Sequence, residues 1–324
     1  MKAFNFLLVM IGSMPFACAN AYVDEWDSQH AVIMGTNIRI EAYAKELVKY
    51  QGCVDAVFAD LHTLDQLMSP YKDTSDIARI NAAKGRAVKV SGQTYDVIKR
   101  SLYYSAKTAG VFDISFASLG VEYDYKKKQK PSEQRIQVLL PKINYRAIEL
   151  LEDNRVRVPA GTKVDVGGIA KGYGVDRSLE TLKACGLTAA LVAAGGDMKM
   201  YGEINGSPMV VGIKNPRSRS EPLIRVPLTN VAISTSGDYE RFYMSGDERI
   251  HHIINPQTGK PSYQSQSVTV LCQRSMDCDA LSTSLFIMGV KRGLAFINSL
   301  DGYDAIMIDS AGKLHFSAGL LMGR

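Results

Sequence analysis

The chain has 324 residues, of which 46% are hydrophobic and 22% are charged, with a formal net charge of +5 at pH 7. These values are ordinary for a globular protein, and no second apolar run after the N-terminus is long enough for a membrane helix. Much of the positive charge lies in one segment, KKKQK at 126–130, so we expect a solvated loop, or docking to an acidic partner or membrane surface, and no nucleic-acid partner.

The N-terminus reads as a secretory signal. Lys2 precedes an apolar run at 4–16, and the small residues Ala19, Asn20 and Ala21 match an A-x-A cleavage site. We expect residues 1–21 to be removed and the mature protein to be exported to the periplasm. Cys18 raises the alternative of a lipoprotein associated with the inner membrane, but the residues before it fit that signal poorly.

No linker divides residues 22–324, so we expect a single domain. An exported chain folds where disulfides persist, and the four cysteines of the mature chain allow three pairings. Cys272 ends a predicted strand and Cys278 begins a predicted helix, so a short loop favours pairing of these two. Cys53 and Cys185 lie in helical patterns and fit small buried hydrophobic residues.

The first half of the mature chain shows alternating and helical apolar patterns. The alternation TNIRIEAYA predicts a strand, and apolar residues at helical spacing predict the helix after it. The predicted elements are a strand at 36–44, helices at 45–68, 76–81 and 95–109, and a hairpin at 147–151 and 155–158.

The segment KVDVGGIAKGYGVD at 163–176 combines an acid, adjacent glycines and a lysine. Its pattern predicts a buried strand at 163–166, a turn at Gly167 and Gly168, and a helix from Ala170 that ends at Gly186. Helix N-terminal amides attract anions, and Lys171 adds a charge, so the segment favours a phosphate site. A glycine turn with a solvated lysine is the simpler interpretation.

The second half reads as a succession of strands with short turns, followed by helices. Such strands pair mostly antiparallel, so we predict an α+β fold with largely antiparallel sheets flanked by helices. The predicted strands are 189–193, 198–201, 209–213, 223–226, 231–234, 240–243 and 250–254, followed by helices at 279–289 and 291–300 and a hairpin at 305–309 and 314–317.

Asp279 and Thr283 are four residues apart and share one helix face. Oxygen ligands in that arrangement suit Mg²⁺, which also binds substrate phosphates. A helix-start cap at Asp279 and a surface residue at Thr283 are the simpler interpretations. His252 is a candidate general base, with a structural histidine as the alternative.

Several motifs in order resemble the exported ApbE flavin transferases, or FAD:protein FMN transferases, over nearly the whole mature chain. They are MGT at 34–36, SPY at 69–71, SDIARIN at 75–81, GGIAKGY at 167–173, AAGGDM at 193–198, STSGDYERF at 234–242, HHIINPQTGKP at 251–261 and DALST at 279–283. The resemblance implies an ApbE-like, T-fold-related architecture. It implies cleavage of FAD at its pyrophosphate, magnesium-dependent transfer of FMN to a threonine or serine, and release of AMP. Acceptors would be exported or membrane electron-transfer subunits, such as those of sodium-pumping NADH:quinone reductase or Rnf-type complexes.

The resemblance also assigns residues to the site. The residues that would contact FAD are Met34, Tyr71, Phe112, Asp113, Asp165, Lys171 and Ile253. The magnesium ligands would be Asp279, Thr283, Ser282 and the carbonyl of Gly168. Two segments depart from the family pattern: DISFASLG at 113–120 replaces a DPTVGPL-like run, and Asn255 replaces a common aspartate.

Three functions remain open at this point. FMN transfer to a protein leads, with Lys171 neutralising phosphate charge and His252 acting as the base. Asp238 is the next candidate base. A magnesium-dependent FAD pyrophosphatase, in which water replaces the acceptor hydroxyl, uses the same residues. A non-catalytic flavin-binding protein is the third.

Overall fold

A single antiparallel sheet organises the computed structural model, which describes residues 26–204, 206–218 and 222–322. In this part of the chain eight strands pair in the order β1-β2-β6-β7-β10-β13-β14-β15, every neighbour antiparallel. The strands are β1 Trp26–Ile33, β2 Thr36–Tyr43, β6 Ala190–Ala194, β7 Asp197–Tyr201, β10 Ala232–Gly237, β13 Ser265–Cys272, β14 Asp304–Asp309 and β15 Leu314–Phe316. The predicted signal peptide lies outside the described residues.

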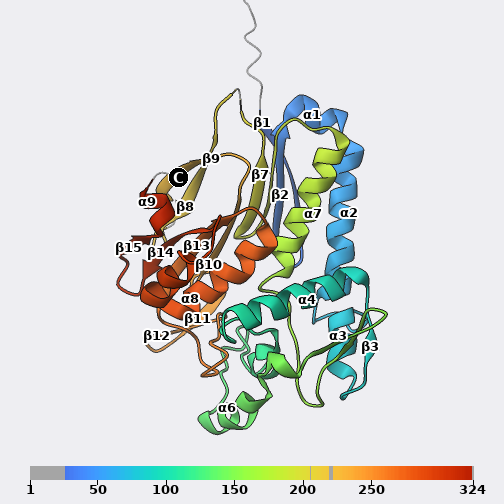
Figure 1. Cartoon of the computed structure of the whole chain (residues 1–324), viewed down its shortest axis with the longest axis vertical. Helices are drawn as coiled ribbons and strands as arrows, with labels where there is room; N and C mark the ends of the chain where they lie inside the picture. The colour runs from blue at the N-terminus through green and yellow to red at the C-terminus, as the bar shows by residue number, and fades with distance from the viewer. Residues whose placement is uncertain (1–25, 205, 219–221, 323–324) are drawn as a thin grey trace, which may run out of the picture.

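Three long helices cover one face of this sheet: α2 (Gln51–Met68), α7 (Ala170–Cys185) and α8 (Ser275–Ile297) (Figure 1). Their apolar sides form the largest core with the inward residues of β2, β6 and β13. The hairpin β8 (Met209–Lys214) and β9 (Pro222–Leu228) covers the opposite face through a second core. Both faces of the sheet are therefore buried. Short helices α1 (Ala44–Lys49) and α9 (Ala318–Leu321) lie at its ends.

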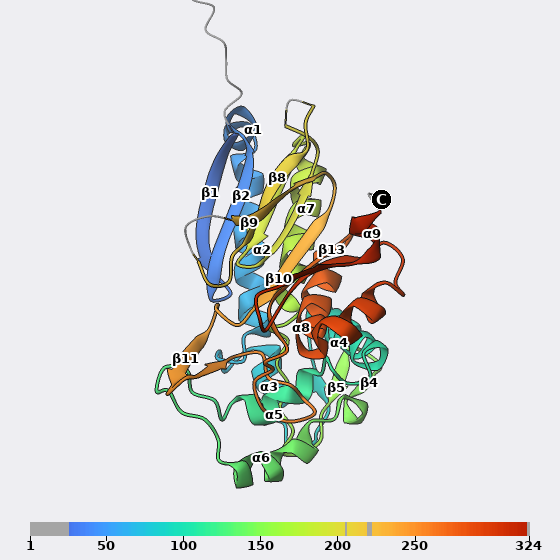
Figure 2. The same ribbon diagram turned by 90° about the vertical axis from the view of Figure 1, so that its left-hand side faces the viewer.

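A smaller region below the sheet contains short helices and a three-stranded sheet in the order β3-β5-β4 (Figure 2). Its elements are α3 Asp76–Ala82, β3 Val88–Lys89, α4 Gly92–Lys107, α5 Ala117–Gly120, α6 Glu133–Leu139, β4 Glu149–Leu151 and β5 Arg155–Arg157, with 3-10 turns at Ile114–Phe116, Leu140–Lys142 and Tyr145–Ala147. The separate hairpin β11 (Phe242–Ser245) and β12 (Glu248–His251) packs on this region through a third core that includes Tyr243, Ile250 and Leu119.

The α+β class and the antiparallel pairing agree with prediction, while several boundaries do not. Strand β1 was missed, and the predicted helix at 45–68 is two helices separated at Tyr50. The helices predicted at 279–289 and 291–300 are confirmed as the two segments of α8 on either side of Gly289, although the first segment begins earlier, at Ser275. Gly289 has φ of 73° and ψ of 174°, a non-helical conformation that only glycine adopts readily, so the helical backbone is interrupted there.

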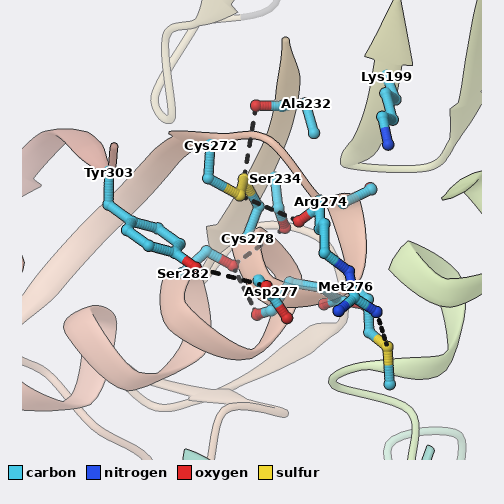
Figure 3. Close-up of a disulfide and its surroundings, with 12 residues drawn as sticks. Lys199, Ala232, Ser234, Cys272, Arg274, Met276, Asp277, Cys278, Ser282 and Tyr303 are labelled. Atoms are coloured by element: carbon cyan, nitrogen blue, oxygen red, sulfur yellow. Dashed lines mark hydrogen bonds between the residues drawn. A yellow bond between two sulfur atoms is a disulfide. The ribbon is translucent and has the colours of Figure 1, made fainter. Parts of the chain in front are cut away.

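Two disulfides link the described part of the chain. Cys272 and Cys278 are bonded across the turn from β13 into α8, which confirms that pairing (Figure 3). Cys53 and Cys185, whose patterns fit small buried hydrophobic residues, form the second disulfide. Helices α2 and α7 pack side by side, so residues 132 positions apart come within bonding distance.

Helix α8 has the length and the apolar composition of a helix that could cross a membrane. It is instead the central helix of the fold, since most of its residues are buried against β10, β13 and α7.

Candidate active site

The glycine turn differs from its predicted form. Residues 163–166 form no strand, because no neighbouring strand offers them partners. Asn81 instead binds both backbone groups of Val164 with its amide, and the amide of Asp165 donates to the carbonyl of Ile114. The Gly167 amide then donates to Oδ1 of Asp165 at 2.7 Å. The turn is therefore fixed by α3 and by the 3-10 turn at Ile114–Phe116, and not by the main sheet.

The starts of α7 and α8 touch at Gly172. A Cβ on this residue would lie 2.3 Å from the carbonyl oxygen of Ser275, so only glycine permits this approach. The contact brings the Gly172 amide to 3.1 Å from Oδ2 of Asp279. This first-turn amide of α7, which we expected to face a phosphate, therefore binds a carboxylate of the protein itself. The Ala170 amide likewise donates to the carbonyl of Val166.

Lys171 lies between two buried carboxylates. Its Nζ is 2.7 Å from Oδ2 of Asp197 and 3.3 Å from Oδ2 of Asp279, and these acids are 2% and 3% exposed. Burial alone would lower the pKa of Lys171, but the two carboxylates outweigh it and raise that pKa. Burial raises the pKa of Asp279, and the negative charge of Asp197 raises it further. One ammonium thus faces two acids, which leaves the cluster short of positive charge.

Side-chain hydroxyls extend this cluster along β10 and α8. The Ser282 hydroxyl lies 3.1 Å from that of Ser234 and 2.9 Å from that of Ser236, and the Thr283 hydroxyl lies 3.2 Å from that of Ser236. Ser234 also donates to Asp197. Figure 3 shows Ser234 and Ser282 pointing toward each other from β10 and α8, next to the disulfide.

The four predicted metal ligands are close to one another. Gly168 lies against α8, since a Cβ on it would be 3.7 Å from Oγ1 of Thr283. Ser282 donates to the carbonyl of Asp279 in the preceding turn. The donors are all oxygens, and the excess carboxylate charge suits a hard cation, so these residues fit magnesium. No cluster of three or more acids, histidines or cysteines occurs among the described residues, and magnesium does not need one.

The interpretation of Asp279 as a helix-start cap is wrong. Helix α8 begins at Ser275 after Arg274, so Asp279 lies in its second turn and is buried against α7. The helix start is held by Asp176, which accepts the amides of Ser275 and Met276. Asp279 is therefore free of a capping role.

The two adjacent histidines differ sharply in their surroundings. His251 is 1% exposed, its Nε2 lies 2.9 Å from the carbonyl oxygen of Ser262, and its Nδ1 accepts the Ile253 amide. His252 is half-buried, and its Nδ1 lies 3.3 Å from the carbonyl oxygen of Arg241. Donation from Nδ1 to that carbonyl leaves the lone pair on Nε2. His252 thus has the arrangement of a base, and His251 that of a structural histidine.

Positive charges converge near His252. Burial lowers the pKa of His252, and Arg241, His251 and Lys171 lower it further, so its imidazole is neutral at pH 7. Burial also raises the pKa of Asp165, against the opposing influence of Gly167, Arg241 and Lys171. The charges of Arg241 and Lys171 therefore act on both His252 and Asp165.

The remaining predicted FAD residues lie against the glycine turn, against α7 or beside the two histidines. Tyr71 is 82% exposed and, with Asp165, lines a surface groove of about 340 Å³. The Phe112 ring lies 3.3 Å from where a Cβ on Gly168 would be. Met34 forms the turn between β1 and β2, where its sulfur reaches Gly174 of α7. Ile253 is buried directly after the two histidines.

Two predicted acids are occupied by structural contacts. Both oxygens of Asp113 accept hydrogen bonds, Oδ1 from Ser115 and Oδ2 from the Tyr145 amide. Asp238 forms a bidentate pair with Arg217 at 2.6 and 2.7 Å, which leaves it poorly suited as the alternative base.

Four polar residues of the site were absent from the predicted set: Asp197, Ser234, Ser236 and Arg241. All lie inside the motifs AAGGDM and STSGDYERF. A carboxylate directly after two glycines, and a run of small hydroxyl residues on one strand, were the available signals.

The site can be compared with known proteins. A sequence model described as the ApbE family matches residues 34–307. A Treponema pallidum protein named FAD:protein FMN transferase is 29% identical over 316 residues, covering 91% of this chain and 87% of that protein. The crystal structure of an ApbE protein from Thermotoga maritima has a TM-score of 0.86 at 28% identity, covering 92% of this chain and 99% of that one. The apo form of Pseudomonas stutzeri flavinyl transferase ApbE has a TM-score of 0.80 at 26% identity, covering 92% and 96%.

Proposed function

Because the chain belongs to the ApbE family, we propose that it is a transferase that moves FMN from FAD to a hydroxyl group of a protein. Relatives along almost the full chain bear the name FAD:protein FMN transferase, which supports flavin transfer. The finer parts of the proposal are dependence on Mg²⁺, a threonine or serine acceptor, and release of AMP.

The observation that supports this most is the joining of Lys171 and Asp279 across α7 and α8. It brings an oxygen-rich cluster of acids and hydroxyls beside the glycine turn, and this supports our proposal that the cluster holds a cation bound to the pyrophosphate of FAD. Magnesium held by Asp279, Ser282, Thr283 and the Gly168 carbonyl would neutralise charge on the pyrophosphate.

His252 takes the acceptor proton in the proposed reaction. The hydroxyl oxygen of the acceptor forms a bond to the phosphorus of the FMN half, and the bond from that phosphorus to the bridging oxygen breaks. The bridging oxygen leaves with AMP, and the hydroxyl proton moves to Nε2 of His252. The low pKa of His252 keeps this nitrogen unprotonated at pH 7 before the reaction.

Lys171 has a supporting role in this scheme. It balances one of the two carboxylate charges of Asp197 and Asp279, and its positive charge opposes the rise in the pKa of Asp279 that burial causes. Direct contact between Lys171 and FAD stays a prediction.

We further propose that the protein acts after export to the periplasm. Both disulfides of the described chain fit an oxidising compartment. N-terminal sequencing of the exported protein should find Tyr22 first, whereas a diacylglyceryl group on Cys18 would identify a lipoprotein instead.

The proposed reaction is tested by product analysis. The protein is incubated with FAD, Mg²⁺ and a purified exported subunit of a sodium-pumping NADH:quinone reductase or Rnf-type complex. In-gel flavin fluorescence of the subunit supports transfer, and free FMN with AMP but no labelled subunit indicates a pyrophosphatase. FAD that binds and stays intact indicates a flavin-binding protein.

A further inference from the structure

Arg241 stands out among the arginines around the site because its charge has no partner within the described part of the chain. Arg217 and Arg249 pair with Asp238, Arg100 pairs with Asp277, and Arg177 pairs with Asp60. For Arg241, no described residue provides an ion pair, a side-chain hydrogen bond or a ring contact to the guanidinium, and the residue is exposed. An unpaired arginine beside a candidate active site is available to bind an anion.

The register of the β11–β12 hairpin places Arg241 next to His252. Phe242 pairs with His251, so one step further along the hairpin Arg241 is opposite His252. The His252 amide donates to the Arg241 carbonyl at 3.1 Å, which continues the pairing. Directly opposite residues project from the same face of an antiparallel pair, so the two side chains are neighbours.

The same alternation places Arg241 on the face of the hairpin opposite to Phe242. Phe242 is 37% exposed and stacks under Arg249, whereas Tyr243 is buried against the ring of Tyr125. Arg241 shares the face of Tyr243 by alternation. Its charge acts on Tyr125, Asp165 and His252, which agrees with a guanidinium directed toward the site.

A phosphate bound at the candidate site needs a positive charge other than that of Lys171. Lys171 is already engaged by Asp197 and Asp279, so it supplies no surplus positive charge. We infer that Arg241 binds the anionic oxygens of the FAD pyrophosphate on the His252 side, at the phosphate that the acceptor hydroxyl attacks. This inference rests on the proposed function and adds a second phosphate-binding group to it. An arginine in this place supports negative charge on the equatorial oxygens as the phosphoryl group is transferred.

The inference is tested by ligand binding, which does not require turnover. Riboflavin shares the isoalloxazine ring of FAD but has no phosphate, so the two ligands separate ring binding from phosphate binding. Arg241→Gln should weaken FAD binding about 10- to 100-fold and leave riboflavin binding within about twofold. Arg241→Lys should recover part of the loss. Arg249→Gln, on the adjacent strand, is the matched control and should bind both ligands as the wild type does.

The pH dependence of transfer gives a second readout. Removing the Arg241 charge should raise the pKa of His252, which Lys171 and His251 continue to lower, so the acidic limb of the kcat/KM profile should move to higher pH. Equal loss of FAD and riboflavin binding in Arg241→Gln, or no loss of either, would overturn the inference. A wild type that binds FAD but transfers nothing would instead overturn the proposed function and leave the binding comparison interpretable.

Discussion

The ammonium of Lys171 lies 3.3 Å from the carboxylate of Asp279, although 108 positions separate the two residues. The pair connects the second residue of α7 to the second turn of α8, and Gly172 makes the approach possible. The glycine turn and the DALST segment, which are distant in sequence, become one site through this contact.

Asp279→Asn should remove the response to magnesium while the protein remains folded. The side-chain amide oxygen that this substitution introduces can still accept the Gly172 amide, but it lacks the charge that a magnesium ligand supplies. We expect at least about a 100-fold loss of FAD cleavage at saturating Mg²⁺. The matched control is Asp277→Asn. Asp277 is a buried acid on the same helix as Asp279, and it pairs with Arg100 of α4. That variant should lose stability and keep its magnesium response; the reverse pattern would refute our ligand assignment.

His252→Ala and His251→Ala should fail in different ways. Loss of a positioned base costs roughly 10² to 10⁴-fold in rate, so His252→Ala should nearly abolish FMN transfer with little change in FAD affinity. His251 is buried and hydrogen-bonded, so His251→Ala should cost about 1–3 kcal/mol of stability and preserve turnover in the folded fraction. Rates and urea midpoints of both variants check this. If His252→Ala loses FAD binding in proportion to activity, His252 is a binding group.

The buried His251 should make the fold sensitive to mild acid. Burial lowers the pKa of His251 to about 4, with Asp238 opposing and Arg249 and Arg217 adding to the shift. The unfolded state therefore binds a proton that the folded state does not between about pH 6.5 and 4, and the free energy of unfolding falls as the pH falls through this window. The loss from this residue is up to about 3 kcal/mol. Urea titrations of wild type and His251→Gln should show a shallower pH slope for the variant; identical slopes would contradict this account.

The two disulfides should contribute unequally to stability. Loop-closure entropy predicts about 5 kcal/mol for Cys53–Cys185, which closes 132 residues, and about 2 kcal/mol for Cys272–Cys278, which closes 6. Cys53→Ser with Cys185→Ser should therefore lower the urea midpoint more than Cys272→Ser with Cys278→Ser. A larger effect of the short-loop pair would show that its main contribution is to hold the start of α8 in the folded state.

Local pattern was sufficient to predict much of the fold. The alternation in TNIRIEAYA gave β2, and the glycine after Cys185 marked the end of α7, where Gly186 adopts a left-handed conformation. Strand β1 was missed because it has no clear alternation of its own and is stabilised by pairing with β2 along its whole length. The strand predicted at 163–166 failed for the opposite reason, since its backbone bonds to the side chains of Asn81 in α3 and Ser118 in α5 and has no partner strand.

The sequence motifs indicated which residues belong to the candidate site, but not which residues they contact. The motifs named Asp279, Thr283, Lys171 and His252 as candidates, and of these Lys171 and Asp279 form an ion pair. The partners of Lys171 could not be predicted, because Asp197 reaches it only through the packing of β7 beneath α7. The Cys53–Cys185 bond was missed for a similar reason, as nothing local shows which helices pack together.

The most direct test of the central claim is the intact mass of an acceptor subunit after incubation with this protein, FAD and Mg²⁺. Our account predicts a mass increase of one FMN linked through a phosphoester, absent in EDTA and lost when the acceptor threonine is replaced by alanine. An unchanged acceptor mass, in a reaction where FAD is fully converted to free FMN and AMP, would contradict it.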